Sequence, residues 1–513
     1  MAFKYLLNTA LPGSAWLASV HSSTGVCVVE HGRLVEVREG FFVEGVWPGP
    51  FQDGHFDRYE TFFGSGAIER AGGEFVFVPS SASVDYLYYR VTPGRTLCSN
   101  SLPYLLAASN DELDEFDARY ARINASIMKG IDGYEQRIPT RHGSVNRLIY
   151  YNLVIKVGGM EQAAKPPAPV FNTFEQYRTY FSDVLAGIIQ NARADGRKNR
   201  LKVLSTQSTG YDSTAINSVS SSAIDLTLCI GEPKERQNYF KKEREANRPN
   251  DSGEEICRHL GLTMHSIDRR YFLRDPSAEE IYWAGLNCCE DMNLHEVSRY
   301  VENGALLFTG SSGDVVWSNA ASLSPDYATN IKGQLERSDL SCHGLSEARL
   351  HLGYVHAPAP YIGARNRKSI FDLSNSESMR PWSVGGSYDR PIPRRLAEEA
   401  GIPRTLFGQV KLATVVEILP PYLPHGERLR DEFAKYIREK RGRMTLLRML
   451  ILPRLNSAIS RLQWKFGRLP WLGSLIDRIP TLGRRFNAVL YAYCVNRVVR
   501  SYARNTRLSP EPP

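Results

Sequence analysis

The spacing of apolar residues divides the chain into two main parts. Over residues 1–160, short apolar runs are separated by polar and glycine-containing turns, a pattern that predicts β-strands. The predicted strands cover Val26–Glu30, Leu34–Val37, Phe75–Val78 and Arg147–Tyr151. The prolines of the stretch 161–169 cannot continue a helix or a central strand, so we expect a linker there.

A helical pattern begins after this linker. Asn172 is the expected N-cap, with Glu175 three residues on as in a capping box, and apolar residues then recur at helical spacing. Beyond residue 200, strands predicted at 203–206, 226–230, 263–267 and 306–308 alternate with helices predicted at 213–219 and 252–260. Such alternation predicts a doubly wound parallel sheet, which binds ligands beyond the carboxyl ends of its strands.

The first strand of this sheet leads into a loop rich in small residues, Ser208–Ser213, with the sequence STGYDS. Small residues let the backbone turn sharply and approach an anion, and the start of the next helix presents N–H groups. Asp212 would repel a phosphate by itself, but it suits a Mg²⁺ ion held between carboxylate and phosphate. We therefore expect phosphate binding by Ser208, Thr209, Gly210 and Ser213. A plain turn that caps a helix is the alternative.

A second loop, Thr309–Asp314, has the sequence TGSSGD and also follows a predicted strand. Gly310 and Gly313 allow a tight loop at the same edge of the sheet, and Asp314 supplies a second carboxylate. Two aspartates from two strand ends can share a Mg²⁺ ion that bridges phosphates. By itself, this loop is also typical of a surface turn.

Taken together, these motifs resemble the asparagine synthetase family. Ser208–Ser213 is similar to the SGGxDS pyrophosphate loop of that family, and Gly310–Asp314 is similar to its Gly-x-Gly-x-Asp loop. The stretch from Tyr388 to Lys411 is similar to the family's C-terminal segment, in which a basic helix leads to a lysine that contacts the phosphates. The resemblance covers about residues 170–415 and extends faintly over 1–120.

The resemblance implies a fold, a domain organisation and a reaction. The expected fold is α/β: an amidase-like (Ntn-type) β-sandwich at 1–160, an ATP-pyrophosphatase domain with a doubly wound parallel sheet at 172–425, and a basic helical region at 426–513. The implied reaction uses ATP to convert a carboxylate into an acyl-adenylate, with release of pyrophosphate, before an amine displaces AMP. The implied roles are catalysis for Lys411, Tyr388 and Asp389, ATP binding for Gly310, Gly313 and Arg395 besides the first loop, and Mg²⁺ binding for Asp212 and Asp314.

The sequence departs from the family pattern at three points. The family's amidase half uses a cysteine at position 2, whereas this chain has Ala2 and its first cysteine is Cys27. Without that thiolate, we expect no release of ammonia from glutamine.

A ligase without amidase activity is similar to β-lactam synthetases and lasso-peptide cyclases, which take the amine from the substrate. The expected substrates are then a peptide, a small molecule or a lipid-linked glycan of a surface-polysaccharide pathway. Thr209 and Ser312 also replace glycines of the two loops.

Charge is unevenly distributed along the chain. The formal net charge is +8, but residues 435–507 hold 17 Lys and Arg against Glu439 and Asp477, so the remainder is net acidic. The mixture of Trp, Phe, Lys and Arg at 464–471 is typical of interfacial membrane segments. Two interpretations stay open: peripheral contact with an anionic membrane, and a helical lid packed on the synthetase domain.

Composition excludes several classes of protein. No apolar run approaches the roughly 18 residues of a transmembrane helix, and the first residues lack the features of a secretory signal, so we expect a cytoplasmic protein. The 8 cysteines form no CxxC pair, which disfavours zinc ribbons. Two alternative functions stay open. One is a tRNA-modifying enzyme, although we see no suitably spaced cysteines and expect no nucleic-acid partner. The other is an inactive synthetase that serves as a binding module.

Overall fold

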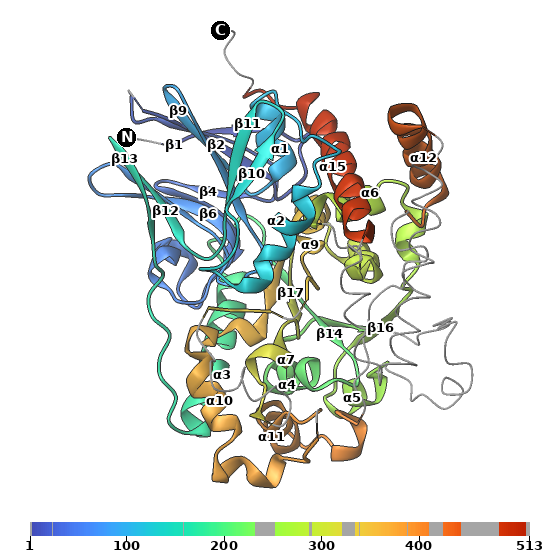
Figure 1. The fold of residues 1–513 in the computed structure, drawn as a ribbon. Coiled ribbons are helices and arrows are strands. Elements are labelled where there is room, and N and C mark those ends of the chain that lie inside the picture. The colour runs from blue at the N-terminus through green and yellow to red at the C-terminus, as the bar shows by residue number, and fades with distance from the viewer. Residues whose placement is uncertain are drawn as a thin grey trace, which may run out of the picture.

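The protein is built on three β-sheets, two in its first part and one in its second (Figure 1). The computed structural model describes residues 3–22, 24–156, 158–230, 252–286, 290–320, 334–337, 339–386, 388–409, 424–442 and 482–508. The expected mixed α/β class is confirmed, including the parallel sheet of the second part. Within the described ranges, no helix combines the length and apolar character needed to span a membrane.

The first sheet has seven strands in the order β1, β3, β2, β9, β8, β11, β10. Strand β1 is parallel to β3, and the other neighbours are antiparallel. The bounds are β1 Phe3–Leu7, β2 Trp16–His21, β3 Cys27–His31, β8 Leu87–Thr92, β9 Arg95–Ser99, β10 Arg137–Thr140 and β11 Gly143–Leu148.

The second sheet has six strands in the order β13, β12, β7, β6, β5, β4, all with antiparallel neighbours. The bounds are β4 Glu36–Arg38, β5 Phe41–Val46, β6 Phe63–Arg70, β7 Glu74–Val78, β12 Asn152–Lys156 and β13 Gly159–Ala163. Side chains of both sheets meet in one apolar core, where the rings of Trp16 and Phe77 lie 6.1 Å apart. The two sheets therefore pack face to face.

Strand β7 is buried on both faces, which explains why its apolar residues form a continuous run. Phe75 and Phe77 belong to the core shared with the first sheet, whereas Val76 and Val78 belong to a second apolar cluster. Successive side chains of a strand point to opposite faces, so both faces of β7 are buried. The predicted strands at Val26–Glu30 and Phe75–Val78 are confirmed within a residue.

Two other predicted strands need correction. The strand expected at Leu34–Val37 is β4, which begins only at Glu36. The strand expected to reach Tyr151 ends at Leu148, because Tyr150 has a φ of 66°, a left-handed conformation that cannot continue a strand. The chain turns there into β12, which the sequence pattern did not predict.

The connection between the two parts is also more ordered than expected. Strand β13 occupies the start of the predicted linker and ends at Ala163. Lys165 is buried, and its Nζ donates to Asn152 Oδ1 at 3.1 Å, so this part of the stretch packs against the body. The next helix, α3 (Phe174–Ala192), is capped by Thr173 in a capping box with Gln176, and the expected cap at Asn172 was wrong by one residue.

The third sheet has five strands, all parallel, in the order β16, β15, β14, β17, β18. The bounds are β14 Lys202–Gln207, β15 Leu226–Ile230, β16 Met264–Ile267, β17 Ala305–Thr309 and β18 Tyr354–Pro358. The four strands predicted for this sheet are confirmed, and β18 is additional. All five residues of β17 are buried, as expected for a central strand covered on both faces.

Helices α4 (Tyr211–Ser220) and α5 (Glu254–His259) correspond to the two helices predicted in this part, with shifted ends.

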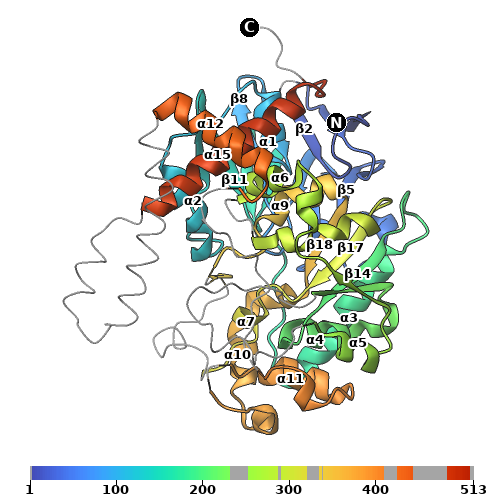
Figure 2. The ribbon, with the colours of Figure 1, turned by 90° about the vertical axis from the view of Figure 1, so that its right-hand side faces the viewer.

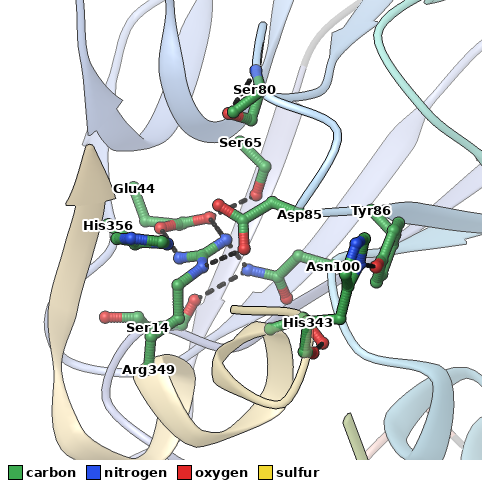
Figure 3. Close-up of polar contacts among 12 residues, drawn as sticks. Ser14, Glu44, Ser65, Ser80, Asp85, Tyr86, Asn100, His343, Arg349 and His356 are labelled. Carbon is green, nitrogen blue, oxygen red and sulfur yellow. Dashed lines mark hydrogen bonds and ion pairs between the residues drawn. The ribbon is translucent and has the colours of Figure 1, made fainter. Parts of the chain in front are cut away.

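A buried ion cluster joins the two parts of the chain (Figure 3). Arg349 of α9 (Leu345–Leu352) is 1% exposed. Its Nε donates to Asp85 Oδ1 at 2.7 Å, and its Nη1 and Nη2 donate to the two carboxylate oxygens of Glu44 on β5 at 2.7 and 3.1 Å. Burial raises the pKa of both carboxyls, and the guanidinium acts in the opposite direction. Asn100 also donates to Glu44 and to the carbonyl of Ser14.

The last described helix lies across both parts of the chain (Figures 1 and 2). Helix α15 (Leu482–Ala503) contacts α1 (Leu102–Ala108) and α2 (Arg119–Ala125) of the first part and α6 (Ala278–Leu286) of the second. The Asn496 side chain bonds both the N–H and the C=O of Leu113 at 2.9 Å. Arg497 pairs with Glu280 at 2.5 Å and with Glu432 of α12 (Glu427–Arg441) at 2.7 Å.

The contacts of α12 and α15 show how the described parts of the basic C-terminal region are packed. The described parts of that region, α12 and residues 482–508, pack on the body of the protein and bury residues such as Phe433 and Tyr491. These two segments are therefore packed, but α15 contacts both parts of the chain and not the second part alone. The mixed stretch at 464–471, on which the membrane interpretation depends, lies outside the described residues.

We expect Arg349→Met to lower the free energy of unfolding by about 3–5 kcal/mol, because it leaves Glu44 and Asp85 buried without their counter-ion. Urea unfolding followed by circular dichroism measures the change. Arg380→Met is the matched control, since Arg380 is 78% exposed and pairs with exposed Glu377. The triple variant Arg349→Met, Glu44→Gln, Asp85→Asn should recover part of the loss. Equal stability of Arg349→Met and the control would contradict this role.

Candidate functional site

The loop after β14 is held in shape by its own hydroxyl groups. Ser208 Oγ accepts from the N–H of Gly210 at 3.1 Å, and Ser213 Oγ accepts from the N–H of Ser208 at 3.2 Å. The two serine hydroxyls lie 3.3 Å apart. Helix α4 then begins at Tyr211, two residues earlier than predicted, and its N-cap residue, Gly210, has no side chain with which to cap the helix. A helix start without a side-chain cap is the usual place for an anion to bind backbone N–H groups.

The second loop packs directly against the first. A Cβ atom at Gly313 would lie 2.3 Å from Asp212 Cγ, and one at Gly310 would lie 2.8 Å from Asp212 Cβ. Both distances are shorter than real Cβ atoms show, so a larger residue at either position would force Asp212 to move. The two loops therefore meet at the Asp212 side chain, as their placement after neighbouring strands of one sheet predicts.

This contact lies where the strand order of the parallel sheet reverses. From β14 the chain proceeds outward through β15 and β16, and it then returns to place β17 and β18 on the other side of β14. The loops after β14 and β17 thus leave adjacent strands in opposite directions. Open α/β sheets bind their ligands in the crevice at such a reversal.

The two aspartates are half-buried at this edge, with Asp314 in the first turn of the short helix α7 (Gly313–Val316). The described residues contain no cluster of three or more His, Cys, Asp or Glu side chains able to hold a metal. Mg²⁺ needs no such cluster, because one or two carboxylates suffice when phosphate oxygens and waters complete its shell. Asp212 and Asp314 would thus suit a Mg²⁺ ion that arrives with a polyphosphate.

The segment at 388–409 closes over the first loop. The ring of Tyr388 lies 5.0 Å from that of Tyr211, and the N–H of Gly408 donates to the carbonyl of Thr209 at 2.9 Å. Burial, with Asp212 nearby, raises the pKa of Tyr388 well above its ordinary value, so this phenol stays protonated at neutral pH. The described part of the third stretch, which begins at Tyr388, therefore lies next to the first of the two loops, which itself contacts the second.

Asp389 and Arg395 have structural partners instead. The buried Asp389 carboxylate accepts from Asn319, from Ser383 and from the backbone N–H groups of Val384 and Gly385, so it organises the preceding turn.

Arg395 lies on α11 (Pro391–Glu399) between the rings of Phe174 and Trp382, 3.9 and 4.3 Å from their centroids, and it pairs with Glu175 and Glu399. Among the described residues, its partners include none of the two loops. Lys411 lies outside the described residues.

Arg394, which the sequence did not single out, contacts the first loop, whereas Arg395 does so with none of its described partners. It is 1% exposed, donates to the Tyr211 hydroxyl and lies over the Tyr211 ring at 5.0 Å. Adjacent residues of a helix point about 100° apart, so the two neighbouring arginines have different surroundings. Buried Ala397, three residues after Arg394, lies on the same side of α11 as Arg394 and shares an apolar cluster with Tyr211, so this side of the helix faces the first loop.

Because a Cβ at Gly313 would overlap the Asp212 carboxylate, we expect Gly313→Ala to lower the free energy of unfolding by about 1–3 kcal/mol. Gly159→Ala is the control, since a Cβ there meets no heavy atom within 4 Å. Thermal unfolding of both variants measures the difference. A Gly313→Ala protein as stable as the control would show that the two loops are not in contact.

No protein-family model matches the chain, and no curated protein matches it. The likeness to asparagine synthetases therefore depends on the loops at Ser208–Ser213 and Gly310–Asp314 and on the segment that begins at Tyr388.

Proposed function

We propose that the protein is an ATP-dependent carbon–nitrogen ligase of the asparagine synthetase type. In this proposal, a carboxylate attacks the α-phosphorus of ATP, pyrophosphate leaves, and an amine then attacks the acyl carbon and releases AMP. The paired sheets of the first part correspond to an amidase-like sandwich, and the parallel sheet corresponds to an ATP-pyrophosphatase domain.

The observation that carries the proposal is the contact between two glycine-containing loops at the point where the strand order reverses. Asp212 of one loop fits against Gly310 and Gly313 of the other, and α4 begins beside them at its N-cap residue Gly210. Gly210 has no side chain, so a phosphate group can approach the backbone N–H groups at the start of the helix. The carboxylates of Asp212 and Asp314 then require a cation, which Mg²⁺ bound to the polyphosphate supplies.

Each group of this site has a task in the proposed reaction. The backbone N–H groups at the start of α4, with the hydroxyls of Ser208 and Ser213, hold the departing pyrophosphate. Asp212 and Asp314 orient the bound metal, which would neutralise charge on the phosphates. Arg394 fixes the Tyr211 ring at the helix start and is a positioning residue. Lys411 is assigned the stabilisation of negative charge at the reacting centre, as the family resemblance implies.

We propose that the first part of the chain does not produce the amine from glutamine. Position 2 is Ala2, and the first cysteine, Cys27, is fully buried in the core between the two sheets. Burial raises the pKa of the Cys27 thiol well above its ordinary value, so it is not a nucleophile. A substrate amine or free ammonia would then reach the ligase site without glutamine.

We accordingly expect no glutaminase activity from the purified protein. Glutamate release from glutamine should equal that of a no-enzyme control, with or without Mg-ATP. ATP-stimulated glutamate release that survives Cys27→Ala would show that another group of the first part opens glutamine.

Asp212→Asn and Asp314→Asn should abolish carboxylate-dependent exchange of pyrophosphate into ATP, because each variant removes a charge that holds the metal. Lys411→Ala should still bind ATP but lose about 10²–10³ in rate. Isotope exchange with a panel of carboxylates measures both effects, and Asp53→Asn outside the site is the control. Wild-type exchange by Asp314→Asn would contradict the two-loop metal site, and ATP binding without exchange for any carboxylate would favour a binding module.

A further inference from the structure

Two cysteines of the second part are in contact beside the first loop. Cys229 is in β15 and Cys257 is in α5, and their Sγ atoms lie 3.5 Å apart, within hydrogen-bonding distance of each other. Both side chains are fully buried, and both are free thiols in this structure. The sulfur atoms of a disulfide are about 2.05 Å apart, so an approach of roughly 1.5 Å would join the two residues.

Cys229 is the neighbour of the residue that leads into the first loop. In the pairing of β14 with β15, Cys229 is the partner of Gln207, the last residue of β14. The Nε2 of Gln207 donates to the Ser208 carbonyl at 2.5 Å and to Thr214 Oγ1 at 3.0 Å. Its Oε1 accepts from Asn217 Nδ2 at 2.6 Å. Gln207 therefore joins the loop to α4, and Cys229 lies one strand away from it.

Cys257 is connected to the same residue through the start of α5. Its N–H donates to the Gly253 carbonyl at 3.1 Å. Gly253 has a φ of 64°, and a Cβ atom there would lie 2.7 Å from Gln207 Cγ and 3.1 Å from the carbonyl carbon of Ser208. Helix α5 thus begins in direct contact with the backbone of the first loop.

Helix α5 also packs against the helix that follows the first loop. Ile256 shares an apolar cluster with Tyr211, the first residue of α4, and the two helices lie close together in both views (Figures 1 and 2). The opposite side of α5 is exposed at Glu255, Arg258 and His259. A helix of six residues that is packed on one side opens locally at low cost, and such opening exposes its cysteine to small solutes.

The contact between the two thiols makes them chemically unequal. The hydrogen bond from Cys229 lowers the pKa of the Cys257 thiol, and the positive charge of Arg258 acts in the same direction, against the effect of burial. The same hydrogen bond raises the pKa of Cys229. Because an oxidant reacts with the thiolate rather than the thiol, Cys257 is the residue that reacts first.

We propose that Cys229 and Cys257 are a reversible oxidation site, whose disulfide bond changes the conformation of the first loop. With hydrogen peroxide as the oxidant, the Cys257 sulfur attacks one oxygen, the O–O bond breaks, and a sulfenic acid forms with release of water. The Cys229 sulfur then attacks the Cys257 sulfur, the S–O bond breaks, and a second water leaves. The two thiol protons leave in these waters, and the two electrons lost by the sulfurs reduce the peroxide.

The disulfide would affect the candidate ATP site because it draws α5 toward β15. Gly253 would then move against Gln207 and Ser208, which it already touches. Formation of the disulfide does not depend on the proposed function, whereas its effect on Mg-ATP does, because the first loop is proposed to hold the phosphates. We expect the oxidised protein to bind Mg-ATP at least about fivefold more weakly than the reduced protein.

The test compares the full-length protein after treatment with hydrogen peroxide and after later reduction with dithiothreitol. Mass spectrometry of unreduced peptides should find residues 229 and 257 joined. Hydrogen exchange over 205–214 should differ between the two states, and calorimetry should show the weaker Mg-ATP binding. Cys257→Ala and Cys229→Ala should each remove all three effects. Cys494→Ala, which removes an equally buried cysteine of α15, should retain them.

The outcomes separate the oxidation site from the proposed function. Absence of the 229–257 bond after peroxide treatment, or hydrogen exchange over 205–214 that the bond leaves unchanged, overturns the proposal. Effects that persist in the alanine variants overturn it as well, and either variant decides if the other does not fold. A reduced protein that fails to bind Mg-ATP, while its first loop still responds to oxidation, overturns the proposed function and supports the oxidation site.

Discussion

The Arg349 ion cluster is the interaction on which the arrangement of the molecule depends. A guanidinium from α9 enters the sandwich of the first part and finds Glu44 and Asp85 there, both buried with it. None of the three charges can be buried without the others, because each would then lack a counter-ion in a region that water does not reach. The cluster therefore fixes α9, and with it β18 and the parallel sheet, against β5 and β6 (Figure 3).

The candidate site follows from the order of the parallel strands rather than from any single residue. Because β14 and β17 are neighbours whose connections run in opposite directions, their loops meet at one edge, and small residues allow the contact with Asp212. The segment that begins at Tyr388 is held over the first loop by the contact between the Tyr388 and Tyr211 rings and by the hydrogen bond from the Gly408 N–H to the Thr209 carbonyl. Three stretches that are far apart in the sequence thus surround one helix start.

Ion pairs with the body of the protein balance part of the positive charge of the basic C-terminal region. Arg497 pairs with Glu280 and Glu432, and Arg500 lies 3.3 Å from Glu112, so part of the excess positive charge is balanced by acidic residues of the body. The apolar residues of α15 are buried between helices of the two parts. The described end of the region therefore ties the two parts together, as the ion cluster also does.

The sequence by itself determined the class of fold, the parallel sheet and the two loops, because strand alternation and small residues are local properties of the chain. It could not separate Arg394 from Arg395, since their difference lies in which rings and carboxylates surround each side chain. Nor could it show that Arg349 meets two buried carboxylates of the first part. Those distinctions were decided only by the tertiary structure, because the partners of a buried charge come from segments distant in sequence, and burial makes the presence or absence of each partner energetically large.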